Sequence, residues 1–424
     1  MKILFSTWAW SSHYFPMVPL AQACRAAGHD VRVASQPALV AAIRSSGLPA
    51  VVVGSDVDVN ALFRDQVAPL IKAGSAEPAR RTSLAIGIFV RVAEAMADDL
   101  VSFTQRWQPE LVVFDPITFA APIAAAVTGV PAVRHLFGPD FTSGGARPGA
   151  AGASAGAGGA GGTGAAGAGA GTAGAGTGTG PANGARASAG PEMPGMAALL
   201  ARFCVPDLQL RGTLTVDPCP PSMQPSAAVT PREPMAYVPY NGQGVMPRWP
   251  SGPGHRVCLT WGTSTVALTG DDSFLPPAVI TAAKDTGAEI VIAVTAEQRR
   301  LLPELPPGAK VLESVPLHLV LPECAAVVHQ GGAGTTLTAA ALGVPQVILP
   351  QLPDQRFNAQ QAAATGAARC LPVADLTAES AAGSIAAVLD EPGPAAAALA
   401  LRQEILAQPQ PADVVTKLEA LAAA

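Results

Sequence analysis

The stretch HQGGAGTT, residues 329–336, decides how the second half of this chain is interpreted. It follows an apolar run, 324–328, that is typical of a buried strand, and it places three glycines and two hydroxyl side chains where a helix would begin. Glycines at a strand-to-helix turn expose backbone N–H groups that can bind an anion, but they also occur there for steric reasons alone. The stretch by itself leaves both interpretations open.

Short β-branched segments alternate with helical segments on both sides of this stretch. We expect strands at 2–8, 30–35, 49–54, 111–115 and 130–134 in the first half, and at 256–262, 289–295, 310–313, 325–329 and 345–349 in the second. Strands separated by helices imply right-handed crossovers and a parallel sheet covered on both faces. The sequence therefore predicts an α/β fold with two doubly wound, Rossmann-like domains.

Composition narrows the class of ligand. The 424 residues exceed one ordinary core, and only 13% of them are charged, with a net charge of -5. Lys and Arg are scattered, which argues against nucleic acid. The N-terminus shows no secretory signal and no apolar run is long enough to span a bilayer, so we expect a cytoplasmic protein. The six cysteines are spread out with no CxxC pair, so we expect buried thiols and no zinc site.

Two segments fall outside the strand-helix pattern. Residues 144–190 are almost only Gly, Ala, Ser and Thr, so we expect disorder there, either as a loop over an acceptor or, as we favour, as a tolerated repeat expansion. Residues 218–253 are rich in proline, as in an ordered linker. We therefore divide the chain into an N-terminal domain, 1–217, a linker, 218–253, and a C-terminal domain, 254–424.

In a doubly wound sheet, ligands bind at the carboxyl ends of the two neighbouring strands where the strand order reverses, normally the first and the fourth. In the first half these strands lead to His13 and Asp115. A histidine oriented by a carboxylate is suited to remove a proton from a hydroxyl. The alternatives are a surface or cap histidine and a carboxylate that caps a helix. His135 follows the fifth strand and lies off this point.

The same rule in the second half brings the loop after Gly262, with Ser264, beside the glycine stretch. Hydroxyls and N–H groups then converge on the N-terminus of a helix, where a diphosphate fits. No lysine follows the glycines, as a Walker loop would require, and the third glycine of the dinucleotide fingerprint is missing.

Several motifs occur in one order along the chain: the opening Ser-x-His13-Tyr-Phe-Pro, then 215–222, then His329-x-Gly-Gly-x-Gly-Thr335, Gly343-Val-Pro345, and Pro350-Gln-Leu-Pro-Asp-Gln355 with Asn358-Ala359. Together they resemble the family 1 glycosyltransferases of the actinobacterial antibiotic-tailoring branch. The resemblance implies a GT-B architecture, with an acceptor-binding first domain and a nucleotide-sugar-binding second domain facing across a cleft.

The resemblance also implies roles for matching residues. His13 matches the general base, and Asp115 matches the carboxylate that orients it. The diphosphate contacts match Ser264, His329, Gly332, Gly334 and Thr335. The nucleobase loop matches Val315, Pro316 and Leu317. Asp354 and Gln355 match the pair that reads the sugar hydroxyls, although a capped turn would explain them equally well. Trp8, Trp10, Tyr14, Phe15 and Phe137 are candidates for apolar walls around the acceptor.

The chain departs from the plant branch at Ser314 and Gly332, where that branch has tryptophans. This departure disfavours uracil stacking, and the resemblance to the antibiotic-tailoring branch implies a thymidine-diphosphate deoxysugar as the donor. We expect inversion at the anomeric carbon and transfer to an aromatic, polyketide-like acceptor. No DxD-like carboxylate pair lies near the glycines, so we expect no metal and no cofactor beside the nucleotide-sugar co-substrate.

Two alternatives remain at this point: a GT-B-type nucleotide-sugar epimerase, and a non-catalytic helper of a partner transferase. An epimerase would act without an acceptor, and a helper would be indifferent to loss of His13. The sequence does not decide between an O- and a C-glycosidic bond, or whether an auxiliary activator protein or a homodimer is required.

Overall fold

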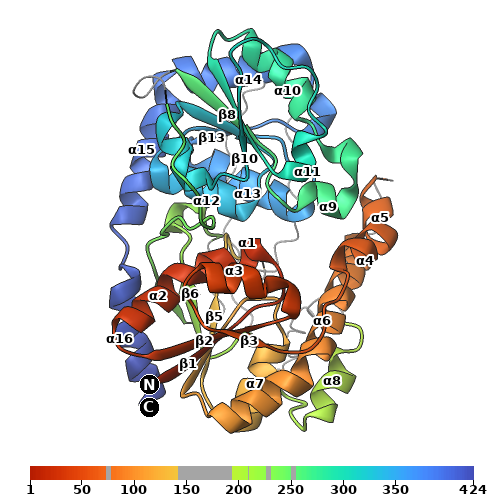
Figure 1. The fold of residues 1–424 in the computed structure, drawn as a ribbon, viewed down its shortest axis with the longest axis vertical. Helices are drawn as coiled ribbons and strands as arrows, with labels where there is room; N and C mark the ends of the chain where they lie inside the picture. The colour runs from red at the N-terminus through yellow and green to blue at the C-terminus, as the bar shows by residue number, and fades with distance from the viewer. Residues whose placement is uncertain (73–77, 142–192, 209, 226–230, 250–254) are drawn as a thin grey trace, which may run out of the picture.

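The computed structural model describes residues 1–72, 78–141, 193–208, 210–225, 231–249 and 255–424. The segment 144–190, for which we predict disorder, lies outside the described residues. The described chain forms two α/β halves, one above the other along the long axis in Figure 1.

The first half is built on a seven-stranded parallel sheet in the order β3-β2-β1-β4-β5-β6-β7. Its strands are β1 (Lys2–Ser6), β2 (Asp30–Ser35), β3 (Ala50–Val52), β4 (Leu111–Phe114), β5 (Ala132–His135), β6 (Leu214–Asp217) and β7 (Arg232–Pro234). The five predicted strands are confirmed, whereas β6 and β7 were not predicted. The strand β7 is three residues long and forms by pairing with β6, within the segment that we interpret as the linker.

The second half holds a six-stranded parallel sheet in the order β10-β9-β8-β11-β12-β13. Its strands are β8 (Arg256–Thr260), β9 (Glu289–Val294), β10 (Lys310–Glu313), β11 (Ala326–His329), β12 (Gln346–Ile348) and β13 (Ala368–Cys370). The five predicted strands are again confirmed, with β13 added. The strand order reverses between β1 and β4 and between β8 and β11, so each half has the predicted switch point.

Helices cover both faces of each sheet (Figure 1). The first half contains α1 (Ser11–Tyr14), α2 (Val18–Ala26), α3 (Val40–Ser45), α4 (Val59–Gln66), α5 (Ala68–Lys72), α6 (Pro78–Trp107), α7 (Ala120–Thr128) and α8 (Met196–Arg202). The second contains α9 (Thr265–Thr269), α10 (Pro276–Lys284), α11 (Ala296–Arg299), α12 (Ala333–Leu342), α13 (Pro353–Ala364), α14 (Ala378–Asp390) and α15 (Pro392–Leu406).

Successive residues of a strand face opposite sides of its sheet, and the core of the first half follows this alternation. Leu4 of β1 packs with side chains of α6 and α7, whereas its neighbours Ile3 and Phe5 pack with side chains of α2. Both faces of the central strands are therefore buried, which explains their continuous apolar sequences. Among the described residues, no helix has both the length and the apolar character that crossing a membrane requires.

The last helix, α16 (Pro411–Ala422), returns to the first half. Its residues Val414, Val415 and Leu418 are buried in the same cluster as Val18 and Leu20 of α2. The chain therefore passes between the halves twice, once through the segment between β7 and β8 and once through 407–410. The domain limits given above stay a proposal, with 411–422 packed against the first sheet.

Candidate active site

His13 lies in the short helix α1, just beyond the carboxyl end of β1, and Asp115 lies at the end of β4. The Nδ1 atom of His13 is 2.7 Å from Oδ2 of Asp115. The carboxylate side chain is fully buried, whereas the histidine side chain keeps 13% of its surface exposed. The switch-point rule thus predicts their proximity correctly, across 102 residues of sequence. Their catalytic roles stay predictions.

The second carboxylate oxygen of Asp115 is held by its own turn. Oδ1 accepts hydrogen bonds from the backbone N–H of Ile117, at 3.1 Å, and from the hydroxyl of Thr118, at 3.2 Å. Thr118 in turn accepts the N–H of Trp8. A carboxylate that faces Nδ1 favours the tautomer with the proton on that nitrogen, and this leaves Nε2 as the basic atom. The local hydrogen bonds therefore orient the imidazole for proton removal.

Aromatic rings surround the imidazole of His13. The ring of Phe137 lies 4.1 Å away, and that of Trp8 lies 5.2 Å away in an edge contact. Trp8 also stacks on Trp10 at 4.7 Å. Tyr14 and Phe15 do not join this wall: Tyr14 is buried against Ser46, and the ring of Phe15 meets that of Tyr240. Three of the five predicted aromatic residues, Trp8, Trp10 and Phe137, thus group with His13, and the other two have partners elsewhere.

The glycine stretch forms the turn from β11 into α12. Gly331 has φ +93°, and a Cβ there would lie 2.8 Å from Ile348 Cγ2, so only glycine fits. Gly332 is the N-cap of α12 and supplies no side chain to the first N–H groups of the helix. A Cβ on Gly334 would meet nothing within 4 Å. The N-terminus of α12 is therefore open and carries the positive end of the helix dipole.

His329 is buried beneath this turn. Its Nδ1 accepts the N–H of Gly331 at 3.0 Å, so Nε2 carries the proton and donates to Oε1 of Gln346 at 2.9 Å. Burial lowers the pKa of His329 to about 4, which keeps the ring neutral. Both ring nitrogens have protein partners here and shape the glycine turn. Its contact with a diphosphate stays a prediction.

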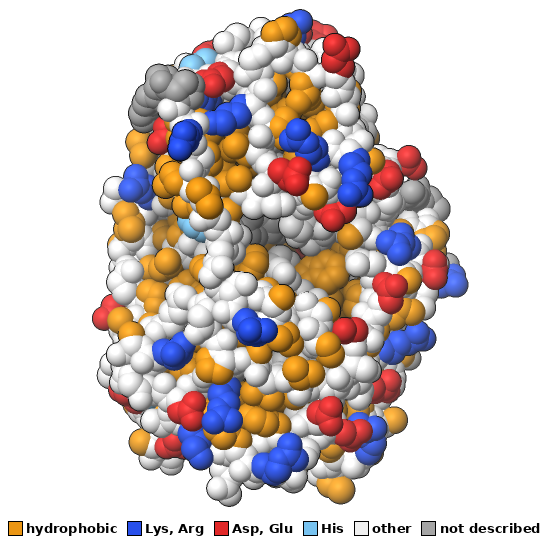
Figure 2. Space-filling model, in the orientation of Figure 1, with side chains coloured by type: hydrophobic (Ala, Val, Ile, Leu, Met, Phe, Trp, Pro, Cys, Tyr) orange, Lys and Arg blue, Asp and Glu red, His pale blue; other side chains and the backbone are white. Residues whose placement is uncertain are grey.

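Ser264 lies at the N-cap of α9, and its hydroxyl accepts the indole N–H of Trp10 at 3.0 Å. This hydrogen bond joins the second half to the aromatic wall beside His13. Thr335, in the first turn of α12, is largely buried. Between them, the structure brings loops from both halves to one place. Figure 2 shows a hollow between the halves, with hydrophobic side chains along it.

Asp354 and Gln355 begin α13 and differ in their surroundings. Gln355 is buried: its Oε1 accepts the N–H groups of Gln351 and Leu352, and its Nε2 donates to Thr265. The amide thus caps α13 and joins it to α9, as the capped-turn alternative predicts. Asp354 is exposed. The surrounding protein raises the pKa of Asp354, while backbone hydrogen bonds and the nearby charge of His13 lower it. Asp354 and His13 are therefore near enough for their charges to interact.

The predicted nucleobase loop follows β10. Ser314 has φ +55°, which turns the backbone sharply before Val315. Pro316 is in contact with Gly244 of the segment between the halves, and the N–H of His318 donates to Asn241 at 3.0 Å. The contact between residues 241–244 and this loop was not predicted, because the proline-rich segment has no periodic sequence pattern that would place it. A separate cavity of about 250 Å³ lies beside α6, and none of the predicted site residues lines it.

Comparison with known families matches both halves of the chain. Residues 22–151 and 158–262 match the erythromycin biosynthesis protein CIII-like N-terminal domain, and residues 278–421 match the corresponding C-terminal domain. The chain is 36% identical to 10-deoxymethynolide desosaminyltransferase of Streptomyces venezuelae, over 100% of this chain and 97% of that one. It is 37% identical to the TDP-daunosamine transferase DnrS of Streptomyces peucetius, again over 100% of this chain and 97% of the relative.

Solved structures give the same result. The glycosyltransferase VinC in complex with dTDP is 31% identical with a TM-score of 0.74, and the match covers both chains fully. The spinosyn rhamnosyltransferase SpnG complexed with thymidine diphosphate is 31% identical with a TM-score of 0.76, over 99% of this chain and 100% of that one. These relatives are named as sugar transferases, which favours transfer over the epimerase and helper alternatives. The chain therefore belongs to the antibiotic-tailoring branch of the family 1 glycosyltransferases and is a nucleotide-sugar-dependent glycosyltransferase with the GT-B fold.

Proposed function

We propose that this enzyme transfers a deoxysugar from thymidine diphosphate to a hydroxyl of a polyketide-like natural product, with inversion and without a metal ion. The observation that carries the proposal is the His13–Asp115 pair at 2.7 Å, which Phe137 and Gly138 connect to Ala333 at the N-terminus of α12. A group that removes a proton and a helix N-terminus that binds an anion then act on the same bound substrates.

The base acts on the acceptor. With Nδ1 of His13 held by Asp115, Nε2 takes the proton of the acceptor hydroxyl as its oxygen attacks the anomeric carbon. The positive charge that forms on the imidazole is stabilised by the buried carboxylate 2.7 Å away. The bond to the diphosphate breaks on the opposite side of the sugar, so one displacement inverts the configuration.

The leaving diphosphate is held by the second half. The N-terminal amides of α12 face it, and the space beyond Gly334 is open to receive it. The hydroxyls of Thr335 and Ser264 add neutral donors; Ser264 now accepts from Trp10, so its own proton is free to donate. Preorganised N–H groups stabilise the charge that develops as the bond breaks, and this is the role that we assign in place of a metal ion.

The donor is oriented at its two ends. We assign the nucleobase to the loop Val315–Leu317, where the left-handed Ser314 presents the following backbone. We assign the sugar hydroxyls to Asp354, and a shaping role to Gln355 through its cap on α13. Thymidine is supported by the names of relatives, which include a TDP-daunosamine transferase and structures with thymidine diphosphate.

The acceptor lies against Trp10 and Phe137, whose flat rings suit a hydrophobic aglycone, while the buried Trp8 supports Trp10 from behind. Relatives act on macrolide and anthracycline aglycones by name, among them 10-deoxymethynolide and aklavinone. For this chain we propose an aromatic acceptor. We further propose a cytoplasmic location, with an activator protein or a homodimer as possible partners.

A mass-spectrometric screen tests the proposal. Thymidine- and uridine-diphosphate sugars are each incubated with a panel of aromatic and macrolide aglycones, and the products are analysed for anomeric configuration by NMR. We expect glycoside from a thymidine-diphosphate deoxysugar with inverted configuration. Preferential use of uridine-diphosphate sugars, retained configuration, or isomerisation of the donor without acceptor would contradict it.

A further inference from the structure

The segment that follows β5, residues 136–140, touches both halves of the site. The ring of Phe137 lies 4.1 Å from the imidazole of His13. A methyl group on Gly138 would lie 2.7 Å from Cβ of Ala333, the first residue of α12. One short segment therefore contacts the base on one side and the helix that faces the diphosphate on the other.

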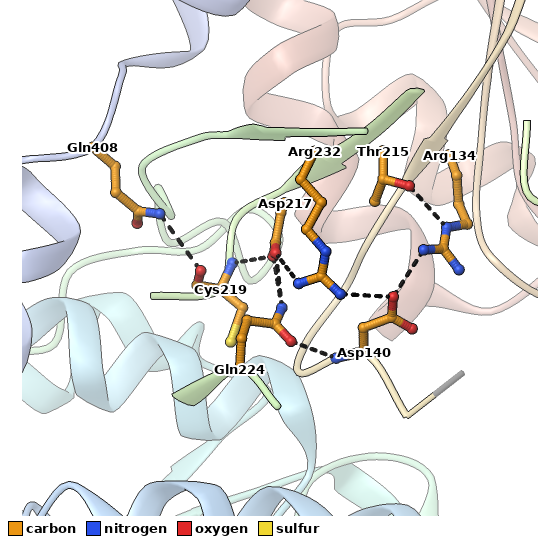
Figure 3. Close-up of polar contacts among 8 residues, drawn as sticks. All are labelled: Arg134, Asp140, Thr215, Asp217, Cys219, Gln224, Arg232 and Gln408. Atoms are coloured by element: carbon orange, nitrogen blue, oxygen red, sulfur yellow. Dashed lines mark hydrogen bonds and ion pairs between the residues drawn. The ribbon is translucent and has the colours of Figure 1, made fainter. Parts of the chain in front are cut away.

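Asp140 anchors this segment. Its side chain is 1% exposed, and Oδ2 accepts hydrogen bonds from Arg134 of β5 at 2.8 Å and from Arg232 of β7 at 3.1 Å (Figure 3). Its backbone N–H donates to Gln224 at 2.9 Å. Two strands and the segment after β6 thus fix the position of this residue.

The anchor is continuous with a segment that packs against the second half and with the return crossing between the halves. Arg232 also pairs with Asp217 at 2.8 Å, and Gln224 donates to both oxygens of that carboxylate. Asp217 accepts the N–H of Cys219, whose carbonyl oxygen lies 3.5 Å from Nε2 of Gln408 (Figure 3). The segment 217–224 joins β6 to β7 and packs against the second half, where Cys219 and Met223 share a core cluster with Leu337 of α12. The segment 407–410 is the return crossing, so one polar cluster joins both segments to the Phe137–Gly138 segment.

Asp140 and Asp217 form ion pairs with Arg134 and Arg232 in this cluster. A buried ion-pair network contributes little net stability over apolar packing, yet removal of one partner leaves an uncompensated buried charge. Its effect here is geometric, because Asp140 lies two residues from the contact between the halves. On the assignment of His13 as the base, we propose that Asp140 is a positioning residue that sets the separation between His13 and the N-terminus of α12 through Phe137 and Gly138.

The first test changes the contact and leaves the charges alone. Gly138 has no left-handed φ, so Gly138→Ala is conformationally accessible, and its methyl group can fit only if Ala333 moves away by about 1 Å, since carbon atoms pack at roughly 3.5–4.0 Å. A displacement of that size costs about 100-fold in rate. We expect this loss in kcat, with an unchanged Kd for thymidine diphosphate, because the donor residues move as one body.

The double variant Gly138→Ala/Ala333→Gly removes the clashing methyl group, since the next atom of residue 333 lies 3.9 Å away. We expect its kcat to return to that of Ala333→Gly alone. A merely structural defect would lower the melting temperature and weaken thymidine diphosphate binding together with kcat. Wild-type kcat in Gly138→Ala, or a double variant as slow as Gly138→Ala, would overturn the proposal.

The second test is Asp140→Asn, with Asp98→Asn as the matched control because Asp98 forms an exposed pair with Arg202. We expect kcat to fall for Asp140→Asn alone, with the donor Kd unchanged in both variants. If Asp140→Asn does not fold, the Gly138 series decides. His13→Ala distinguishes failure of the proposed function from failure of the positioning role. Full activity of His13→Ala would refute the proposed function. Loss of activity in His13→Ala, together with wild-type kcat in the Gly138 and Asp140 variants, would refute only the positioning role.

Discussion

Asp115→Asn is the substitution that most directly probes the base. The amide has nearly the shape of the carboxylate, but only one of its two ends accepts hydrogen bonds. Oδ1 of Asp115 accepts from Ile117 and Thr118, so the amide oxygen of the variant occupies that position. The NH₂ group then faces Nδ1 of His13, which forces the proton onto Nε2. The nitrogen that should take the acceptor proton is thereby blocked.

The magnitude follows from two competing costs. Flipping the amide would restore the tautomer but would leave two donors against Ile117 and Thr118, at about 1–3 kcal/mol for each unsatisfied group. Accepting the wrong tautomer forfeits general base catalysis, which contributes about 10²- to 10⁴-fold, or roughly 3–5.5 kcal/mol. The two ranges overlap, so neither orientation of the amide avoids a large cost. We expect kcat to fall by about 10²- to 10⁴-fold.

The assay is initial-rate product formation by liquid chromatography and mass spectrometry at saturating donor, with thymidine diphosphate Kd and melting temperature as controls. For a phenolic acceptor the deficit should shrink as the pH approaches about 10, where phenols ionise without a base. A folded variant that binds thymidine diphosphate normally and keeps the wild-type kcat would refute the assignment, as would a deficit confined to the donor KM.

Three further outcomes are expected. Gly334→Ala should keep or raise the melting temperature, because Ala is favoured over Gly in helices by about 0.5–1 kcal/mol. The same variant should bind thymidine diphosphate about tenfold more weakly or worse, because the added methyl group enters the open space at the N-terminus of α12. An unchanged Kd in calorimetry would contradict this expectation. Excess EDTA should leave kcat unchanged in the product assay, and a loss restored by magnesium would exclude the metal-free mechanism. Burial lowers the pKa of both His135 and His329 to about 4. Below pH 6.5 the unfolded chain therefore binds protons at these histidines that the folded chain does not bind. The free energy of unfolding should fall between about pH 6.5 and pH 4, by up to roughly 3 kcal/mol for each histidine. Urea midpoints measure this fall, and His135→Asn, whose amide can still donate to the Leu136 carbonyl, should flatten it; a wild-type midpoint that stays constant over this range would exclude the linkage.

The sequence by itself predicted every strand whose apolar residues are continuous enough to be recognised, together with the two switch points. It also placed His13 beside Asp115, because the carboxyl ends of parallel neighbours meet wherever the strand order reverses. The glycine turn at 331–334 was predicted for the same local reason: a tight turn into a helix demands residues without side chains.

Tertiary structure alone decided what depends on partners distant in the chain. The strands β7 and β13, with sequences Arg-Glu-Pro and Ala-Arg-Cys, contain no apolar run that would predict them and form only through pairing with a neighbour. Gln355 and His329 form hydrogen bonds with Thr265 and Gln346, which only the fold brings near them. The sequence motif does not show which of their side-chain atoms are used in this way. The return of α16 and the cluster around Asp140 likewise arise from burial between distant segments. Local pattern specifies elements and turns, whereas the pairing of polar groups depends on which surfaces exclude water together.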